Sequence, residues 1–118
     1  MGNHLCHFEF VVSDSGKGKE FYGKVFDWSF KADEGMAAYT MIDTGTAPGG
    51  GMMKKPDTVP QYALTVYFCV DSIDETMAKV AGAGGRVIVQ KMEIPNMGWW
   101  GLFADPDGIP VGIYEAKK

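Results

Sequence analysis

The chain has 118 residues, of which 46% are hydrophobic, and a formal net charge of −4. This length suits a single domain, residues 1–118, with enough apolar content for a packed core. The negative charge disfavours nucleic-acid binding, which needs a basic surface, and no apolar run approaches the roughly 20 residues that span a bilayer.

Two cysteines, Cys6 and Cys69, are present. So few cysteines are typical of reduced thiols in a cytoplasmic protein and not of a disulfide framework. Because alternate residues of a strand face opposite sides of a sheet, we expect the two thiols on opposite faces, too far apart to form a disulfide.

The first half of the chain predicts one strand, one helix and three further strands. In the strand at 5–12, one face carries only apolar side chains, whereas the other carries His7, Glu9 and Val11. Ser13 and Asp14 offer an N-cap for a helix that ends near Phe26. The expected buried stripe of this helix consists of Phe21, Tyr22, Val25 and Phe26. Further strands are predicted at 28–32, 36–43 and 50–54.

The second half repeats this order. Residues 55–61, with two prolines, are the predicted linker between a first module at 5–54 and a second at 62–118. A strand at 64–70 precedes a helix that opens with a capping box at Ser72 and Glu75. Strands are expected at 86–93, 99–104 and 111–115. Asp105 and Asp107 flank Pro106 before Gly108, so we interpret them as turn residues and not as an acid–base pair.

An ordered set of short motifs supports a family resemblance. These motifs are His7-Phe-Glu-Phe, Asp14, Phe21-Tyr22 and Phe26-Asp27-Trp28 in the first half, and Val70-Asp71 and Asp105-Pro-Asp-Gly in the second. The set resembles the vicinal oxygen chelate superfamily of glyoxalases, bleomycin-resistance proteins and extradiol dioxygenases. The resemblance implies an α+β fold of two βαβββ modules, whose mixed or antiparallel sheet curls into an open barrel around a cavity, in a homodimer.

In the metal-dependent members of that superfamily, the first and last strands of each module supply one ligand each. These positions fall here on His7, Thr65, Gly51 and Gly112. Only His7 can bind a divalent metal well, although Glu9 could share its face and Cys69 could add a third donor. We therefore expect no metal and no cofactor.

The sheet faces opposite the helices are the predicted ligand-binding surface. They carry His7, Glu9, Met53, Thr65, Tyr67 and Tyr114, together with one of the adjacent Trp99 and Trp100. Parity leaves open which tryptophan this is. A mostly apolar set with few polar groups is typical of a small-molecule pocket, although a closed barrel filled by its own side chains is the alternative. Glu9 could orient His7 and make it a catalytic base, so these two are the catalytic candidates.

Three functions remain open. The favoured one is a bleomycin-resistance-like protein that binds a small organic molecule without metal. A metal-dependent glyoxalase-type lyase or isomerase, or a dioxygenase, is the second, and it would need metal to polarise its substrate. The third is a non-enzymatic interaction module. The sequence thus does not decide whether the protein is an enzyme.

Overall fold

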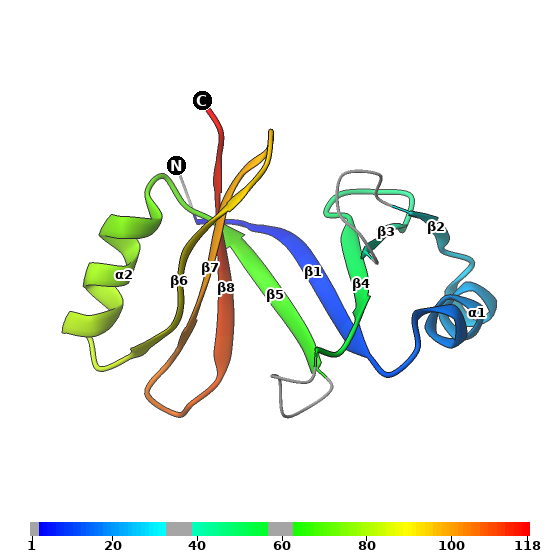
Figure 1. Ribbon diagram of the computed structural model, residues 1–118, viewed down its shortest axis with the longest axis horizontal. Helices are drawn as coiled ribbons and strands as arrows, with labels where there is room; N and C mark the ends of the chain where they lie inside the picture. Colours follow the sequence, from blue (N-terminus) through cyan, green and yellow to red (C-terminus); the bar gives the residue numbers. More distant parts are fainter. Residues whose placement is uncertain (1–2, 33–38, 57–62) are drawn as a thin grey trace. The chain divides into compact units, whose positions relative to one another are not determined.

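The computed structural model describes residues 3–32, 39–56 and 63–118 (Figure 1). The chain forms two compact units, His7–Thr65 on the one hand and Val66–Lys118 with the residues up to Cys6 on the other. Each unit combines one helix with a mixed set of strands, which confirms the predicted α+β class. The predicted linker at 55–61 lies largely outside the described residues.

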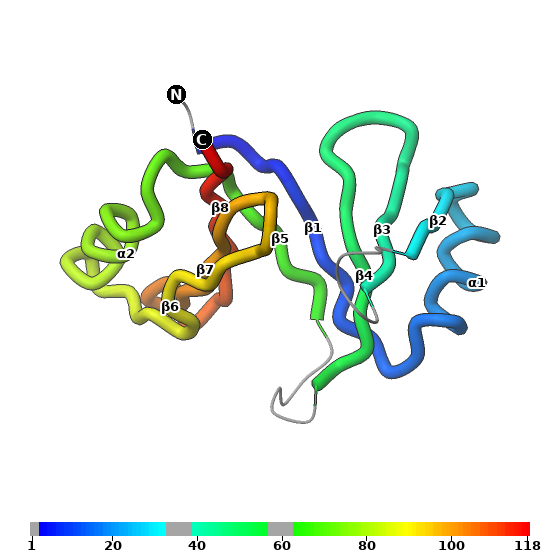
Figure 2. Tube along the Cα trace, turned by 45° about the horizontal axis from the view of Figure 1, so that its top comes forward, coloured from blue at the N-terminus to red at the C-terminus, as the bar shows by residue number. Residues whose placement is uncertain are grey.

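The first unit follows the predicted order of strand, helix and three strands. Its elements are β1 (Leu5–Val12), α1 (Ser15–Phe26), β2 (Ser29–Ala32), β3 (Tyr39–Asp43) and β4 (Gly50–Lys54). The strands lie in the order β2-β3-β4-β1, with β1 parallel to β4 and the other pairs antiparallel. Figure 2 shows β3 and β4 joined by a wide connection, residues 44–49. The strand predicted at 36–43 begins at Tyr39 among the described residues.

Both ends of α1 are capped by hydrogen bonds between residues that are close in sequence. The Asp14 side chain accepts a hydrogen bond from the Lys17 amide at 3.1 Å, as the N-cap prediction requires. At the other end, Asp27 adopts a left-handed conformation with φ of 58°, and its amide donates to the Gly23 carbonyl at 3.0 Å. The helix therefore stops where the sequence predicted.

The expected buried stripe of α1 was wrong for three of its four residues. Phe21, Val25 and Phe26 are 59%, 52% and 53% exposed. Tyr22 packs inward, with its ring centroid 4.7 Å from that of Phe10, and the Phe26 ring packs only at its edge of the sheet, with its centroid 4.8 Å from that of Trp28. The reason is that helical spacing identifies an apolar stripe but does not say how far the helix rotates over its sheet.

The second unit repeats the architecture. Its elements are β5 (Ala63–Cys69), α2 (Ile73–Gly82), β6 (Arg86–Ile94), β7 (Gly98–Ala104) and β8 (Pro110–Ala116). The strands lie in the order β5-β8-β7-β6, with β5 parallel to β8 and the rest antiparallel. In Figure 1, α2 lies beside β6. Its Ile73 and Met77 pack with Ile113 of β8 into the core of this unit.

Two local predictions in this unit are confirmed. The Ser72 hydroxyl accepts from the Glu75 amide at 3.1 Å and caps α2. The Asp105 carboxylate accepts from the amides of Asp107 and Ile109, at 2.9 Å each, so this aspartate closes a turn. Within the described ranges, neither helix is long and apolar enough to cross a membrane.

Candidate functional site

A half-buried hydrogen-bonded chain links three side chains of the first unit. The Tyr39 hydroxyl donates to Oε2 of Glu9 at 2.9 Å, and its oxygen lies 2.8 Å from Nε2 of His7. A hydroxyl has one proton, and Tyr39 gives it to Glu9, so the bond to His7 requires a proton on Nε2. Tyr39 is only 8% exposed, whereas His7 and Glu9 are half-buried. Sequence reasoning identified His7 and Glu9 but missed Tyr39.

The protonation of His7 follows from its surroundings. Burial lowers the pKa of His7, because removing the imidazole from water disfavours its charged form. The side chain is therefore neutral at pH 7. Glu9, Tyr39 and His7 thus form a chain of polar groups that can recognise hydroxyl or carbonyl groups of a ligand.

All three side chains share the sheet face opposite α1, which we call the Tyr39 face. On the other face, Phe10 packs against Tyr22 of the helix. Strand pairing extends the Tyr39 face sideways: Gly51 is paired with both Glu9 and Met41, and Tyr39 is paired with Met53. The predicted contact residues His7, Glu9 and Met53 therefore lie on one face of one unit.

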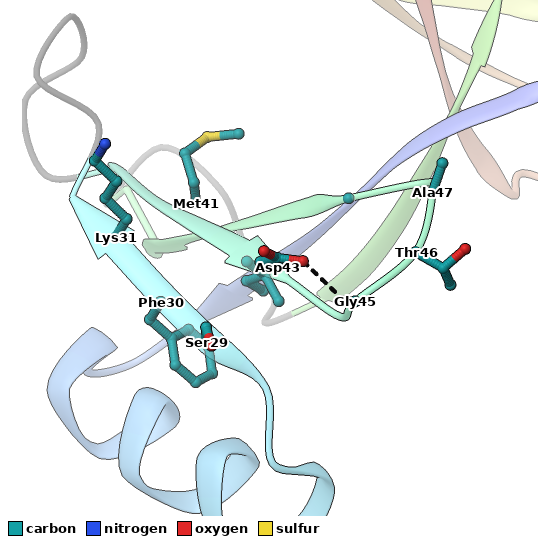
Figure 3. Close-up of a pocket in the computed structure, with 10 residues that line it drawn as sticks. Ser29, Phe30, Lys31, Met41, Asp43, Gly45, Thr46 and Ala47 are labelled. Carbon is teal, nitrogen blue, oxygen red and sulfur yellow. Dashed lines mark hydrogen bonds between the residues drawn. The ribbon is translucent and has the colours of Figure 1, made fainter.

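A hollow of about 660 Å³ adjoins β2, β3 and the connection that follows β3 (Figure 3). Its lining includes Ser29, Lys31, Met41 and Asp43, which alternate along β2 and β3 and share the face of Gly51 by register. In Figure 3, Lys31 and Met41 point away from α1, whereas Phe30 points towards it. Asp43 accepts from the Gly45 amide at 2.8 Å, which shapes the rim.

Sequence reasoning missed the residues of this hollow, although a signal was present. Tyr39, Met41 and Asp43 alternate along the predicted strand at 36–43, so parity already places them on one face. The pairing of Met41 with Gly51 was missing, and it is this pairing that joins the face to His7 and Glu9. Such pairing is not encoded in local spacing.

Five predicted contact residues remain. Four of them lie on the two faces of the second unit, and the fifth, Thr65, is buried. Tyr67, Trp100 and Tyr114 lie opposite α2: Tyr67 is paired with Gly112, and Trp100 with Tyr114. Thr65 is 9% exposed. Trp99 packs instead against the core under α2 and lies under the Lys91 ammonium, whose Nζ is 4.7 Å from the ring centroid. The structure thus answers what parity left open: Trp100 lies on the face opposite the helix.

Tyr114 is held at the end of the second unit. Its hydroxyl donates to the Met97 carbonyl at 2.8 Å, which ties β8 to the turn between β6 and β7. Burial raises the pKa of Tyr114, and the neighbouring thiols of Cys69 and Cys6 add to this effect. The phenol is therefore protonated at neutral pH and serves as a hydrogen-bond donor.

The expected separation of the two cysteines was wrong. The Cys6 and Cys69 side chains are close enough for the Cys69 thiol to raise the pKa of Cys6, and neither is part of a disulfide. Burial, followed by the Cys69 thiol, raises the pKa of Cys6 to about 12. Parity orders side chains within one strand but does not identify the neighbouring strand. Here the Cys69 amide donates to the His4 carbonyl at 2.8 Å and brings the start of β1 to the end of β5.

The positions of the superfamily's metal ligands do not fit a metal ion. A Cβ at position 51 would collide with the Tyr39 hydroxyl, and a Cβ at position 112 would collide with the Tyr67 ring. Tyrosine side chains thus fill the space that last-strand ligands would need. Among the residues that the structure describes, no three His, Cys, Asp or Glu side chains are grouped closely enough to hold a metal ion.

Comparison with known proteins agrees with this architecture. "Putative glyoxylase CFP32" of Mycobacterium tuberculosis is 42% identical over 71 residues, which is 59% of this chain and 27% of that protein. "Anthracycline biosynthesis protein DnrV" of Streptomyces peucetius is 25% identical over 124 residues, 92% of this chain and 45% of that protein. The chain therefore spans less than half the length of these relatives.

A solved structure supports the same fold. The Mn(II)-bound glyoxalase from Novosphingobium aromaticivorans superposes with a TM-score of 0.68 at 18% identity, covering 98% of this chain and 41% of that one. The model of the Glyoxalase/Bleomycin resistance protein/Dioxygenase superfamily matches residues 4–113, nearly the whole chain. The chain therefore belongs to the Glyoxalase/Bleomycin resistance protein/Dioxygenase superfamily, as the sequence motifs predicted.

Proposed function

We propose that this protein binds a small organic molecule on the Tyr39 face without a metal ion. The observation that carries the proposal is the half-buried chain His7–Tyr39–Glu9 on the same sheet face as Lys31, Met41 and Asp43, which line part of the hollow. A site of this kind combines an apolar surface with a few fixed polar groups, which is the usual composition of a ligand pocket.

The chemistry of the face suggests the ligand class. Met41 and Met53 offer polarisable, adaptable surface, and methionine adapts well to flat aromatic rings. Lys31 and Asp43 add one charge of each sign at the hollow. Two relatives of this chain are named for anthracycline biosynthesis, and their names support a flat polycyclic aromatic ligand that carries hydroxyl and carbonyl groups.

The fit of the ligand positions weighs against the metal-dependent alternative. A metal centre would have to be built around His7, while Tyr39 fills the space above Gly51. His7 and Glu9 are already joined through the Tyr39 hydroxyl. We therefore propose recognition by hydrogen bonds in place of chelation, and we assign His7 and Glu9 to ligand contact before catalysis.

A homodimer in a reducing, cytoplasmic setting is part of the proposal. Exposed Phe21, Val25 and Phe26 on α1 are suited to such a contact. Light scattering on the wild type and on Phe21→Glu tests it: a dimer that the substitution dissociates supports the contact, and a monomer at all concentrations contradicts it.

Metal analysis and ligand titration test the proposal together. Protein purified without chelators, and again after soaking with zinc, nickel, manganese or iron(II), is expected to hold no stoichiometric metal. Calorimetric titration with 1,4-dihydroxyanthraquinone is expected to show saturable binding. Near-stoichiometric metal that disappears in His7→Ala would overturn the metal-free site.

A matched pair of variants places the ligand. Tyr39→Phe removes the hydroxyl that joins His7 and Glu9 and is expected to weaken binding about tenfold, because buried polar groups lose their partner. Tyr22→Phe makes the same change on the opposite face of the same unit and should leave the affinity unchanged. Equal affinities for wild type and Tyr39→Phe would show that the ligand binds elsewhere.

A further inference from the structure

Two thiols that are far apart in sequence meet inside the second unit. Cys6 lies two residues after His4, whose carbonyl bonds to the end of β5, and Cys69 is close enough to raise the pKa of Cys6. The backbone holds them there, because the Cys69 amide donates to the His4 carbonyl at 2.8 Å. Figures 1 and 2 both show the start of β1 beside the carboxyl end of β5. The contact thus depends on folding and not on sequence proximity.

The surroundings favour reaction between these thiols over metal binding. Both cysteines are half-buried, so a small reagent can reach them. Tyr114 lies directly opposite Cys69 in the strand pairing and is close enough for both thiols to raise its pKa. Within the described part of the chain, no third His, Cys, Asp or Glu completes a metal site around the pair.

We propose that Cys6 and Cys69 form an oxidation-sensitive dithiol, which closes to an intramolecular disulfide on reaction with a small-molecule disulfide. This inference does not rest on the proposed ligand-binding function. The site is distinct from the Tyr39 face, which is built from residues of the first unit.

The reaction is an exchange with oxidised glutathione. The Cys69 thiolate attacks one sulfur of oxidised glutathione, forms a mixed disulfide and releases one glutathione thiolate. Cys6 then loses its proton and attacks the Cys69 sulfur, which releases the second glutathione. The protein loses two electrons and two protons, which the two glutathione molecules gain. No further co-reactant is needed.

The second step sets the pH dependence. Because the pKa of Cys6 is raised to about 12, its thiol is almost entirely protonated at neutral pH. The thiolate is the attacking species, so closure should accelerate as the pH rises.

Incubation of the folded chain with oxidised glutathione tests the pair, with intact mass and free-thiol titration as readouts. We expect a monomer lighter by two hydrogen atoms, with no free thiols, and full reversal by dithiothreitol. Cys6→Ser should stop at a glutathione adduct on Cys69. A stable mixed disulfide on the wild type, or disulfide-linked dimers, would overturn the proposal.

A comparison with unfolded protein separates a preformed pair from chance encounter. The equilibrium constant for closure against glutathione should be at least about tenfold higher in the folded chain than in concentrated urea, where the thiols are the ends of a long flexible loop. Equal equilibrium constants in both conditions would mean that the fold does not hold the thiols together. This readout does not depend on how well either cysteine variant folds.

Discussion

The hydroxyl of Tyr39 occupies the space that a side chain at position 51 would need. Gly51 lies on β4 between Glu9 and Met41, so its missing Cβ makes room for the phenol that joins His7 to Glu9. In the second unit, Gly112 makes room for the Tyr67 ring in the same way. A pair of glycines, each covered by a tyrosine, thus stands at the last-strand ligand positions of the superfamily.

Gly51→Ala tests this close packing. The new methyl group must displace the Tyr39 ring, and overpacking of this kind costs about 1–3 kcal/mol of folding stability. Urea unfolding measures the loss. Gly82→Ala is the control, because a Cβ there meets nothing within 4 Å and alanine favours the helix. If Gly51→Ala is as stable as the wild type, the phenol is not held above Gly51.

His7 makes stability depend on pH. Its folded pKa lies below the unfolded value of 6.5, so the unfolded chain binds a proton first as the pH falls. The contribution of His7 is therefore fully present above about pH 6.5 and is lost as the pH falls through the lowered folded pKa. Urea unfolding of the wild type and His7→Gln between pH 8 and 5 should show a shallower decline in the variant.

The two adjacent tryptophans should differ in their effect on stability. Trp99 packs against the cluster of Ile73, Met77 and Ile113, whereas Trp100 lies on the opposite face of β7. Trp99→Ala should therefore cost about 3 kcal/mol, because it empties part of a core. Trp100→Ala should cost clearly less. Equal losses in chemical unfolding would contradict the assignment of the two faces.

The bond from Tyr114 to Met97 should stabilise the turn between β6 and β7. Tyr114→Phe removes the donor to the Met97 carbonyl. The Met97 amide, which donates to the Ile94 carbonyl at 3.0 Å, should then exchange with deuterium several-fold faster. Amides of α2 serve as the internal control and should exchange as before. No change at Met97 would show that the turn keeps its geometry without this hydroxyl.

Much of the fold could be predicted from local pattern. The caps at Asp14 and Ser72 and the turn at Asp105 follow from short-range hydrogen bonds, which depend on residues two to four positions apart. Alternation of apolar and polar residues along 5–12 likewise placed His7 and Glu9 on a face away from the helix. These features were correct because their causes lie within one element.

The rest was decided by the tertiary structure, because strand pairing joins residues that are distant in sequence. Only the pairing of β3 with β4 brings Tyr39 over Gly51 and completes the chain to His7 and Glu9. Only the bond from Cys69 to His4 brings the two thiols together. The exposure of Phe21 on α1 likewise depends on how the helix packs against its sheet. Local spacing determines which side of its own element a residue faces, whereas its contacts depend on neighbouring strands and helices that spacing does not encode.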